Sequence, residues 1–189
     1  MKGQVKGSVL MHTREYVLER LGTEGWSRVL EAMLPEDREF FAGVILGGGW
    51  YPVVHWNRLN EIVLPRLGRD SADGMRNLAA HIAQRDLSTV YRLVMKLGSP
   101  EFILRRTGQL WSRYYDTGML KPIEVSNSRW KLELTAPTHV ESAPSSATCT
   151  AGVTAWVSSG LLLSGTKATV VESRCRFREG SRCEFDVSW

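Results

Sequence analysis

The sequence predicts an α+β fold, in which an N-terminal helical layer packs on a small antiparallel sheet of two hairpins separated by a buried helix. Apolar residues recur at helical spacing through the first two thirds of the chain, whereas they alternate at strand spacing over 130–134, and 166–175 and 182–189 read as two further strands. A small-residue apolar stretch, 147–165, lies between the two strand regions and is long enough for a helix. Helices and strands grouped in separate runs indicate α+β rather than a parallel α/β sheet.

Glycine and proline divide the helical region into segments. We expect Gly22 to end the first helix and Thr23 to cap a second, which Pro35 stops. Pro35 also suits the first position of a third helix. The glycines at 47–49 predict a break, because three in series have a high entropic cost of ordering. Further helices are expected over 53–68, 71–98 and 100–118.

The remainder of the chain predicts two hairpins around one helix. Trp130, Leu132 and Leu134 alternate with polar residues, and a turn at 126–128 would pair them with the preceding segment. Two more strands flank a turn that contains Gly180. We expect one domain over 1–189, with a helical part at 1–117 and a hairpin–helix–hairpin part resembling a ligand-binding module at 118–189.

Composition excludes several functional classes. The apolar share of 43% and the charged share of 23% are those of a soluble globular protein. Net charge is +4 with scattered basic residues, so we expect no nucleic-acid partner. No stretch approaches the roughly 20 apolar residues of a membrane span, and the N-terminus does not read as a signal peptide. We therefore expect a cytoplasmic location.

The three cysteines and one acid form the first candidate site. Cys149, Cys175, Cys183 and Glu172 offer the thiolates and occasional carboxylate that zinc binds. Glu172 and Cys175 are three residues apart, so on a regular strand they would face opposite sides. Both could bind one ion only if a bulge intervenes or Cys175 lies past the regular strand. Alternatively, the cysteines are small buried hydrophobes and Glu172 is a surface carboxylate.

The C-terminal segment "VVESRCRFREGSRCEFDVSW", read as V-x-E-x-x-C-x-x-x-x-G-x-x-C-x-F, resembles the signature that ends the four-vinyl-reductase domain. The upstream "CTAGVTAWVSSGLLLSGTKATVVE" resembles the helix and strand before that signature. The order of elements also resembles a wider superfamily, which includes TRAPP tethering subunits and heme–nitric-oxide-binding domains. The opening "MKGQVKGSVL" and "YVLERLGTEGWSRVLEAML" are similar to the start of those heme-binding domains. The whole chain further resembles a large paralogous family of bacterial proteins.

The resemblance implies a cofactor and a class of function. Some four-vinyl-reductase domains hold a structural zinc, and their ligand pattern falls on Cys149, Glu172, Cys175 and Cys183. Most proteins of this type look like binding modules rather than enzymes. The expectation is therefore a structural zinc and no catalysis.

Heme is not expected from the residues. It needs an axial ligand, most often histidine, and His55 is the histidine best suited to a buried position. A lone histidine there is more often a satisfied core residue. The heme-binding relatives use a Tyr-x-Ser-x-Arg motif, which this sequence lacks. Phosphate-loop, dinucleotide and nucleophile-elbow motifs are also missing, so we expect no enzyme.

The predicted function is a non-catalytic small-molecule-sensing or regulatory module with an apolar pocket. Trp50, Trp56 and Trp130 are candidates to line that pocket around a small apolar or aromatic molecule, although plain core packing is the alternative. The alternative function is a dimeric protein-interaction or scaffold module without a ligand, and a tetrapyrrole-related enzyme is the third. A pocket of a few hundred Å³ would favour sensing. We also expect a homodimer, because the apolar residues of 71–98 change face along the helix.

Overall fold

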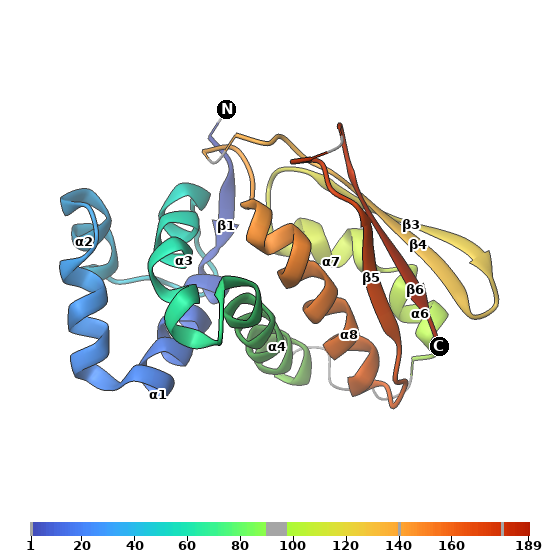
Figure 1. The fold of residues 1–189 in the computed structure, drawn as a ribbon, viewed down its shortest axis with the longest axis horizontal. Helices are drawn as coiled ribbons and strands as arrows, with labels where there is room; N and C mark the ends of the chain where they lie inside the picture. Colours follow the sequence, from blue (N-terminus) through green and yellow to red (C-terminus); the bar gives the residue numbers. More distant parts are fainter. Residues whose placement is uncertain (1, 90–97, 140, 179) are drawn as a thin grey trace.

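Helices gather at one side of the molecule and a four-stranded sheet lies at the other, as Figure 1 shows. The structure is a computed structural model that describes residues 2–89, 98–139, 141–178 and 180–189. Its N-terminal helices are α1 (Gly7–Glu31), α2 (Pro35–Ala42), α3 (Val53–Leu67) and α4 (Ser71–Thr89). Two shorter helices, α6 (Pro100–Leu104) and α7 (Thr107–Tyr114), lead into the sheet.

Two hairpins build the main sheet. They are β3 (Met119–Ser126) with β4 (Arg129–Thr135), and β5 (Thr169–Arg174) with β6 (Cys183–Ser188). The strand order is β3-β4-β6-β5, so the hairpins join through antiparallel pairing of β4 with β6. Between them the chain forms a π-helix, η1 (Thr148–Val153), which continues as α8 (Thr154–Leu163). The predicted fold class is confirmed.

Several predicted boundaries are correct in kind but not in detail. Gly22 does interrupt the first helix, with φ 70° and ψ −179°, yet α1 resumes beyond it as a kinked helix. Pro35 occupies the first turn of α2, as predicted. The single helix expected over 100–118 is two helices, because the chain turns between α6 and α7. The end of the helix expected over 71–98 falls at 90–97, outside the described residues.

A second, two-stranded sheet was not predicted. β1 (Gln4–Lys6) pairs antiparallel with β2 (Trp50–Pro52), each only three residues long. Val5 also forms a bridge with Tyr115, directly after α7. Strands this short show too few alternations to be recognised in sequence. Together these contacts hold the helical layer beside the segment that leads into the main sheet.

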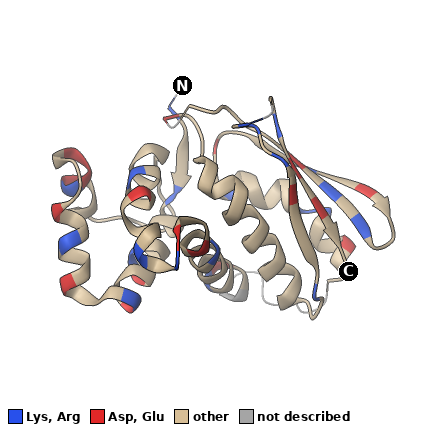
Figure 2. Cartoon of the chain, in the orientation of Figure 1, with Lys and Arg blue, Asp and Glu red and all other residues tan. Residues whose placement is uncertain are grey.

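Helix α4 is the central element. It packs against α3, α1, α8 and η1, so its apolar side chains are covered from within over the described range. Helix α8, by contrast, carries no charged residue and lies between α4 and β5 (Figure 2). The described helices include none that is both long enough and apolar enough to cross a bilayer.

A candidate ligand cavity and a buried thiol cluster

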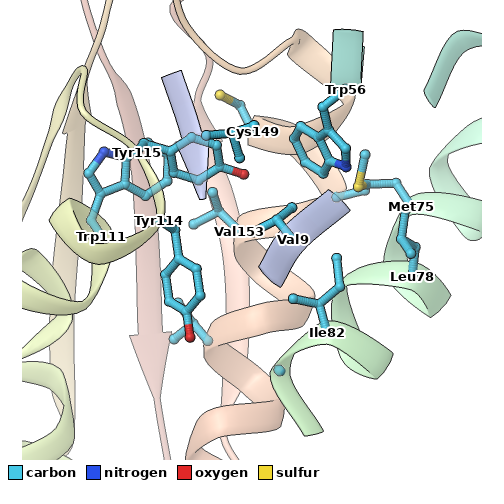
Figure 3. Close-up of a cluster of buried hydrophobic side chains, with 14 of the residues drawn as sticks. Val9, Trp56, Met75, Leu78, Ile82, Trp111, Tyr114, Tyr115, Cys149 and Val153 are labelled. Carbon is cyan, nitrogen blue, oxygen red and sulfur yellow. The ribbon is translucent and has the colours of Figure 1, made fainter. Parts of the chain in front are cut away.

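An apolar cavity of about 60 Å³ lies where the helical layer meets α7 and η1. Its wall comes from α1, α3 and α4 on one side and from α7, β3, η1 and α8 on the other (Figure 3). Nearly all of its surface is hydrocarbon. The described lining residues are Val9, Trp56, Met75, Ala79, Ile82, Trp111, Tyr114, Tyr115, Leu120, Thr148, Gly152, Val153 and Trp156.

The aromatic residues of the wall present carbon rather than polar atoms to the cavity. Trp56 donates its indole N–H to Thr13 Oγ1 at 3.0 Å, and Trp111 donates its own to the carbonyl of Thr117 at 3.0 Å. Burial raises the pKa of Tyr115, and the nearby Cys149 adds to that rise, so its hydroxyl stays neutral. The cavity is therefore suited to uncharged molecules.

The π-helix forms one part of the wall. π-helical turns are rare and are often found at functional sites. Gly152 lies in η1, and a Cβ there would come within 3.2 Å of Met75 Sδ. Thr148 is only 4% exposed, yet its Oγ1 has no hydrogen-bond partner among the described residues. An unsatisfied buried hydroxyl costs about 1–3 kcal/mol.

The structure divides the three tryptophans that were candidates for the pocket. Trp56 is buried and lines the cavity. Trp50 is 38% exposed on β2, with Lys6 Nζ 4.6 Å from its ring centroid. Trp130 is buried in β4, away from the described cavity wall, with Arg105 over its ring. Trp111 and Trp156 also line the cavity.

The C-terminal hairpin brings most of the predicted metal ligands together. One ligand atom each from Glu172, Cys175 and Cys183 lies within 4.8 Å of the others. The register of β5 shifts between Glu172 and Arg174, and the strand ends before Cys175. This irregularity lets two residues three apart approach the same site, as the sequence required. Cys149 is buried nearby but does not join that close group.

A buried arginine, missed in the sequence, occupies the thiol cluster. The Arg176 guanidinium donates to Cys149 Sγ, and its Nη2 donates to the carbonyl of Pro144 at 2.7 Å. The backbone N–H of Arg176 donates to Cys183 Sγ at 3.3 Å. Arg176 is 3% exposed, so it needs an anion close by. The sequence could not identify Arg176 as the buried arginine, because the hairpin segment contains four arginines and nothing in their spacing distinguishes this one.

Ionisation within the cluster follows from these contacts. A hydrogen bond from Cys149, together with the backbone and guanidinium of Arg176, lowers the pKa of Cys183 to about 5. The same sulfur–sulfur hydrogen bond, with burial, raises the pKa of Cys149. Burial raises the pKa of Glu172 to about 6, with a further rise from the charge on Cys183. At neutral pH, Cys183 is therefore a thiolate that balances the charge of Arg176.

The histidines lie away from the cavity. His55 Nδ1 is 2.6 Å from Asp37 Oδ1, and its ring stacks on Phe40. His12 lies between Asp86 and Glu15, 3.0 Å from Asp86 Oδ1. His81 stacks against Tyr16, and His139 contacts the backbone of Glu141. None of the four histidines, all within the described part of the chain, lines the cavity.

Comparison with known proteins identifies the fold. No family model matches the chain, and no curated protein matches it. Its structural neighbours include H-NOX proteins from K. algicida, in the Fe(II) unliganded state, and S. oneidensis, in the Fe(II)NO ligation state. The first is 12% identical with a TM-score of 0.73, and it covers 97% of this chain and 95% of that chain. The second is 15% identical with a TM-score of 0.69, and the match covers 97% of this chain and 98% of the S. oneidensis chain.

A third neighbour comes from work on heme redox potential and porphyrin distortion. It is 12% identical with a TM-score of 0.65, and it covers 97% of this chain and 99% of that chain. The class that the fold defines is therefore the H-NOX-like α+β fold. At these identities the likeness establishes the fold and not the activity.

These neighbours correct the expectation about cofactors. The prediction of zinc and no heme is wrong for this fold, because the neighbouring structures are those of heme proteins. The thiol cluster gives a physical reason against the zinc assignment as well. A guanidinium already supplies the positive charge beside Cys149 and Cys183, where the ion was expected.

The described residues around the cavity do not supply a heme site. Heme iron is held by histidine, cysteine thiolate, methionine or tyrosine, and the described wall contains Met75, Tyr114 and Tyr115 but no histidine. The cavity of about 60 Å³ is also well below the roughly 300 Å³ at which pockets for larger ligands begin. In this arrangement the described residues do not fit a heme.

Proposed function

We propose that the chain is a non-catalytic module that senses a small, uncharged, mainly apolar molecule in this cavity. The observation that carries the proposal is the position of the cavity at the junction of the two parts of the fold. A ligand there would touch α1, α3 and α4 on one side and η1 and α7 on the other. Occupancy would therefore change how the helical layer packs on the rest of the molecule.

The size of the cavity limits the ligand. Its volume falls short of the few hundred Å³ that would favour sensing over a scaffold role on size alone. A buried water needs roughly 10–15 Å³, so the space holds a molecule of several heavy atoms rather than a large ring system. A larger ligand would require the two sides of the cavity to separate.

Binding can be followed at the methionine methyl groups. Met75 lines the cavity, whereas Met11 and Met119 are 44% and 61% exposed and serve as internal controls. We expect cyclopentane to shift the ¹³C-methyl NMR signal of Met75 saturably and to leave the two controls unchanged. Hemin is titrated in parallel, because the fold is shared with heme proteins. A saturable Soret band at one heme per chain would make porphyrin the ligand class, and no response to either compound would contradict the sensing proposal.

A second candidate, protein interaction, rests on a separate groove. Leu10, Met11 and Leu18 of α1 face Val44 and Ile45 across a groove of about 740 Å³, and Val44 is 86% exposed. The homodimer was expected because apolar residues of 71–98 change face and would need a second cover. In the described part of α4, other helices of the same chain provide that cover. The groove is the alternative contact surface for that dimer. Light scattering at micromolar concentration tests it, since a mass of one chain at all concentrations would contradict it.

Two finer assignments belong to the same proposal. We assign residues 145–189 to the four-vinyl-reductase type on the strength of the E-x-x-C pattern, whose irregular strand brings Glu172 and Cys175 together. We also propose a cytoplasmic location, which is supported by three cysteines that are all free. Neither assignment requires an enzyme activity.

A further inference from the structure

One residue of the cavity wall differs from the others in its exposure. Every described lining residue except Trp156 is buried. Trp156 of α8 lines the cavity as well, yet its side chain is partly exposed. Among the described residues, it is therefore the part of the wall that meets both the cavity and the solvent.

The three tryptophans of the wall also differ in how their rings are held. Trp56 Nε1 donates to Thr13 Oγ1 at 3.0 Å, and Trp111 Nε1 donates to the carbonyl of Thr117 at 3.0 Å. Trp156 Nε1 makes no hydrogen bond with a described residue. A buried indole usually finds a partner for its N–H, and that bond fixes the direction of the ring. The ring of Trp156 lacks this constraint within the described structure.

The helix around Trp156 leaves room for its ring to move. Residues four positions apart on a helix are neighbours on its surface. For Trp156 these neighbours are Gly152 and Gly160, so neither of them has a side chain that packs against the indole. The ring instead contacts Tyr114 of α7 edge-on, with the two centroids 5.9 Å apart. An aromatic contact of this kind is weak enough to break and re-form in the folded protein.

We propose that the Trp156 indole is the gate of the cavity, and that it swings away from Tyr114 to admit a small apolar guest and then returns to enclose it. The inference rests on the proposed sensing function and adds the route by which the ligand reaches its site. Entry at any other described residue of the wall would require buried, packed side chains to separate. Because the contact with Tyr114 is restored after entry, the gate controls the rates of binding more than the affinity.

A matched pair of substitutions tests the gate. Trp156→Phe and Trp111→Phe make the same chemical change, one at the partly exposed ring and one at a buried ring held by a hydrogen bond. Cyclopentane is the guest, and the ¹³C-methyl signal of Met75 reports its binding, because Met75 lies in the wall. Titration gives the dissociation constant, relaxation dispersion of the same signal gives the dissociation rate, and their ratio gives the association rate.

We expect Trp156→Phe to raise the association and dissociation rates together by roughly two- to tenfold, the range that the loss of one aromatic edge contact allows. The dissociation constant should change less than either rate, and Trp111→Phe should not raise the association rate. An unchanged association rate in Trp156→Phe would overturn the gate and leave the sensing proposal standing. Equal acceleration in both variants would also overturn it, because entry would then follow general loosening of the wall. If cyclopentane does not bind the wild-type protein, the sensing proposal fails and the gate fails with it.

Discussion

Arg176 Nη2 donates to the carbonyl oxygen of Pro144 at 2.7 Å, and this bond ties the C-terminal hairpin to the approach of the π-helix. The same guanidinium contacts Cys149, which lies within that helix. The thiol cluster and the cavity thus share the π-helix, which contributes Cys149 to the first and Gly152 and Val153 to the second.

Two glycines of the π-helix and α8 give a matched test of the cavity. Alanine in place of helical glycine stabilises by about 0.5–1 kcal/mol through helix propensity. Gly152→Ala adds its methyl against Met75 in the cavity wall, whereas Gly160→Ala adds one near Leu87, away from the described wall. We expect Gly152→Ala to weaken cyclopentane binding in the Met75 titration and Gly160→Ala to leave it unchanged. Equal affinities in both variants would mean that the ligand binds elsewhere.

The tryptophans differ in their expected contribution to stability. Trp56→Phe removes a buried donor from Thr13 and enlarges the cavity, so we expect a loss of about 1–3 kcal/mol in the free energy of unfolding. Trp50→Phe changes a partly exposed ring and should cost less than about 0.5 kcal/mol. Urea unfolding measures both. A larger loss for Trp50→Phe would contradict their assigned positions.

Two histidines between α1 and α4 should give opposite pH dependence. The hydrogen bond with Asp86 raises the pKa of His12 above its usual 6.5, so its stabilisation is complete below that pH and is lost as pH rises through the folded value. Burial lowers the pKa of His81, so its contribution is instead lost as pH falls below 6.5. Measuring the unfolding free energy at acidic and at mildly basic pH should distinguish the contribution of His12 from that of His81.

Substituting each histidine should change the pH dependence of the unfolding free energy in opposite directions. Relative to wild type, His12→Gln should gain stability on going from acidic to mildly basic pH, and His81→Gln should lose it. The double variant should vary less with pH than either single variant. A shift of the same sign in both singles would show that these pKa directions do not control the interface between the helices.

The thiolate of Cys183 can be observed by its absorbance at 240 nm. We expect it to titrate near pH 5, where the Cys149 hydrogen bond and Arg176 place its pKa. Cys183→Ser should remove that step, while Cys175→Ser should keep it. Arg176→Met should move the step to higher pH and destabilise the fold by up to about 3–5 kcal/mol, because it leaves a buried anion uncompensated. A step near pH 9 in the wild type would contradict the charge pairing.

The fold could be predicted from sequence largely because its signals are local. Helical spacing, the break at Gly22, Pro35 at a helix start and the two hairpins all follow from residues near one another in the chain. The β1–β2 pair could not be predicted, because it joins residues about 46 positions apart through strands of three residues. The π-helical form of 148–153 likewise carries no pattern that distinguishes it from an α-helix.

The site was harder to predict, because it depends on contacts between distant segments. The zinc hypothesis required Glu172, Cys175 and Cys183 to lie close together on an irregular strand, and the structure has both features, while Cys149 stays outside the close group. Arg176 was not, because its burial depends on the distant carbonyl of Pro144 and on Cys149. Trp56 was correctly placed in the pocket, while Trp50 and Trp130 were not, since the direction of a side chain depends on packing rather than on its own type.

The central claim is that the cavity between the helical layer and the π-helix accepts a small apolar guest. A crystal structure determined under xenon pressure tests it most directly, because xenon enters apolar cavities without any specific polar contact. The account predicts a xenon atom between Trp56, Met75 and Val153, lost or weakened in Gly152→Ala crystals treated in the same way. A cavity that stays free of xenon while the gas occupies other sites in the crystal would contradict the account.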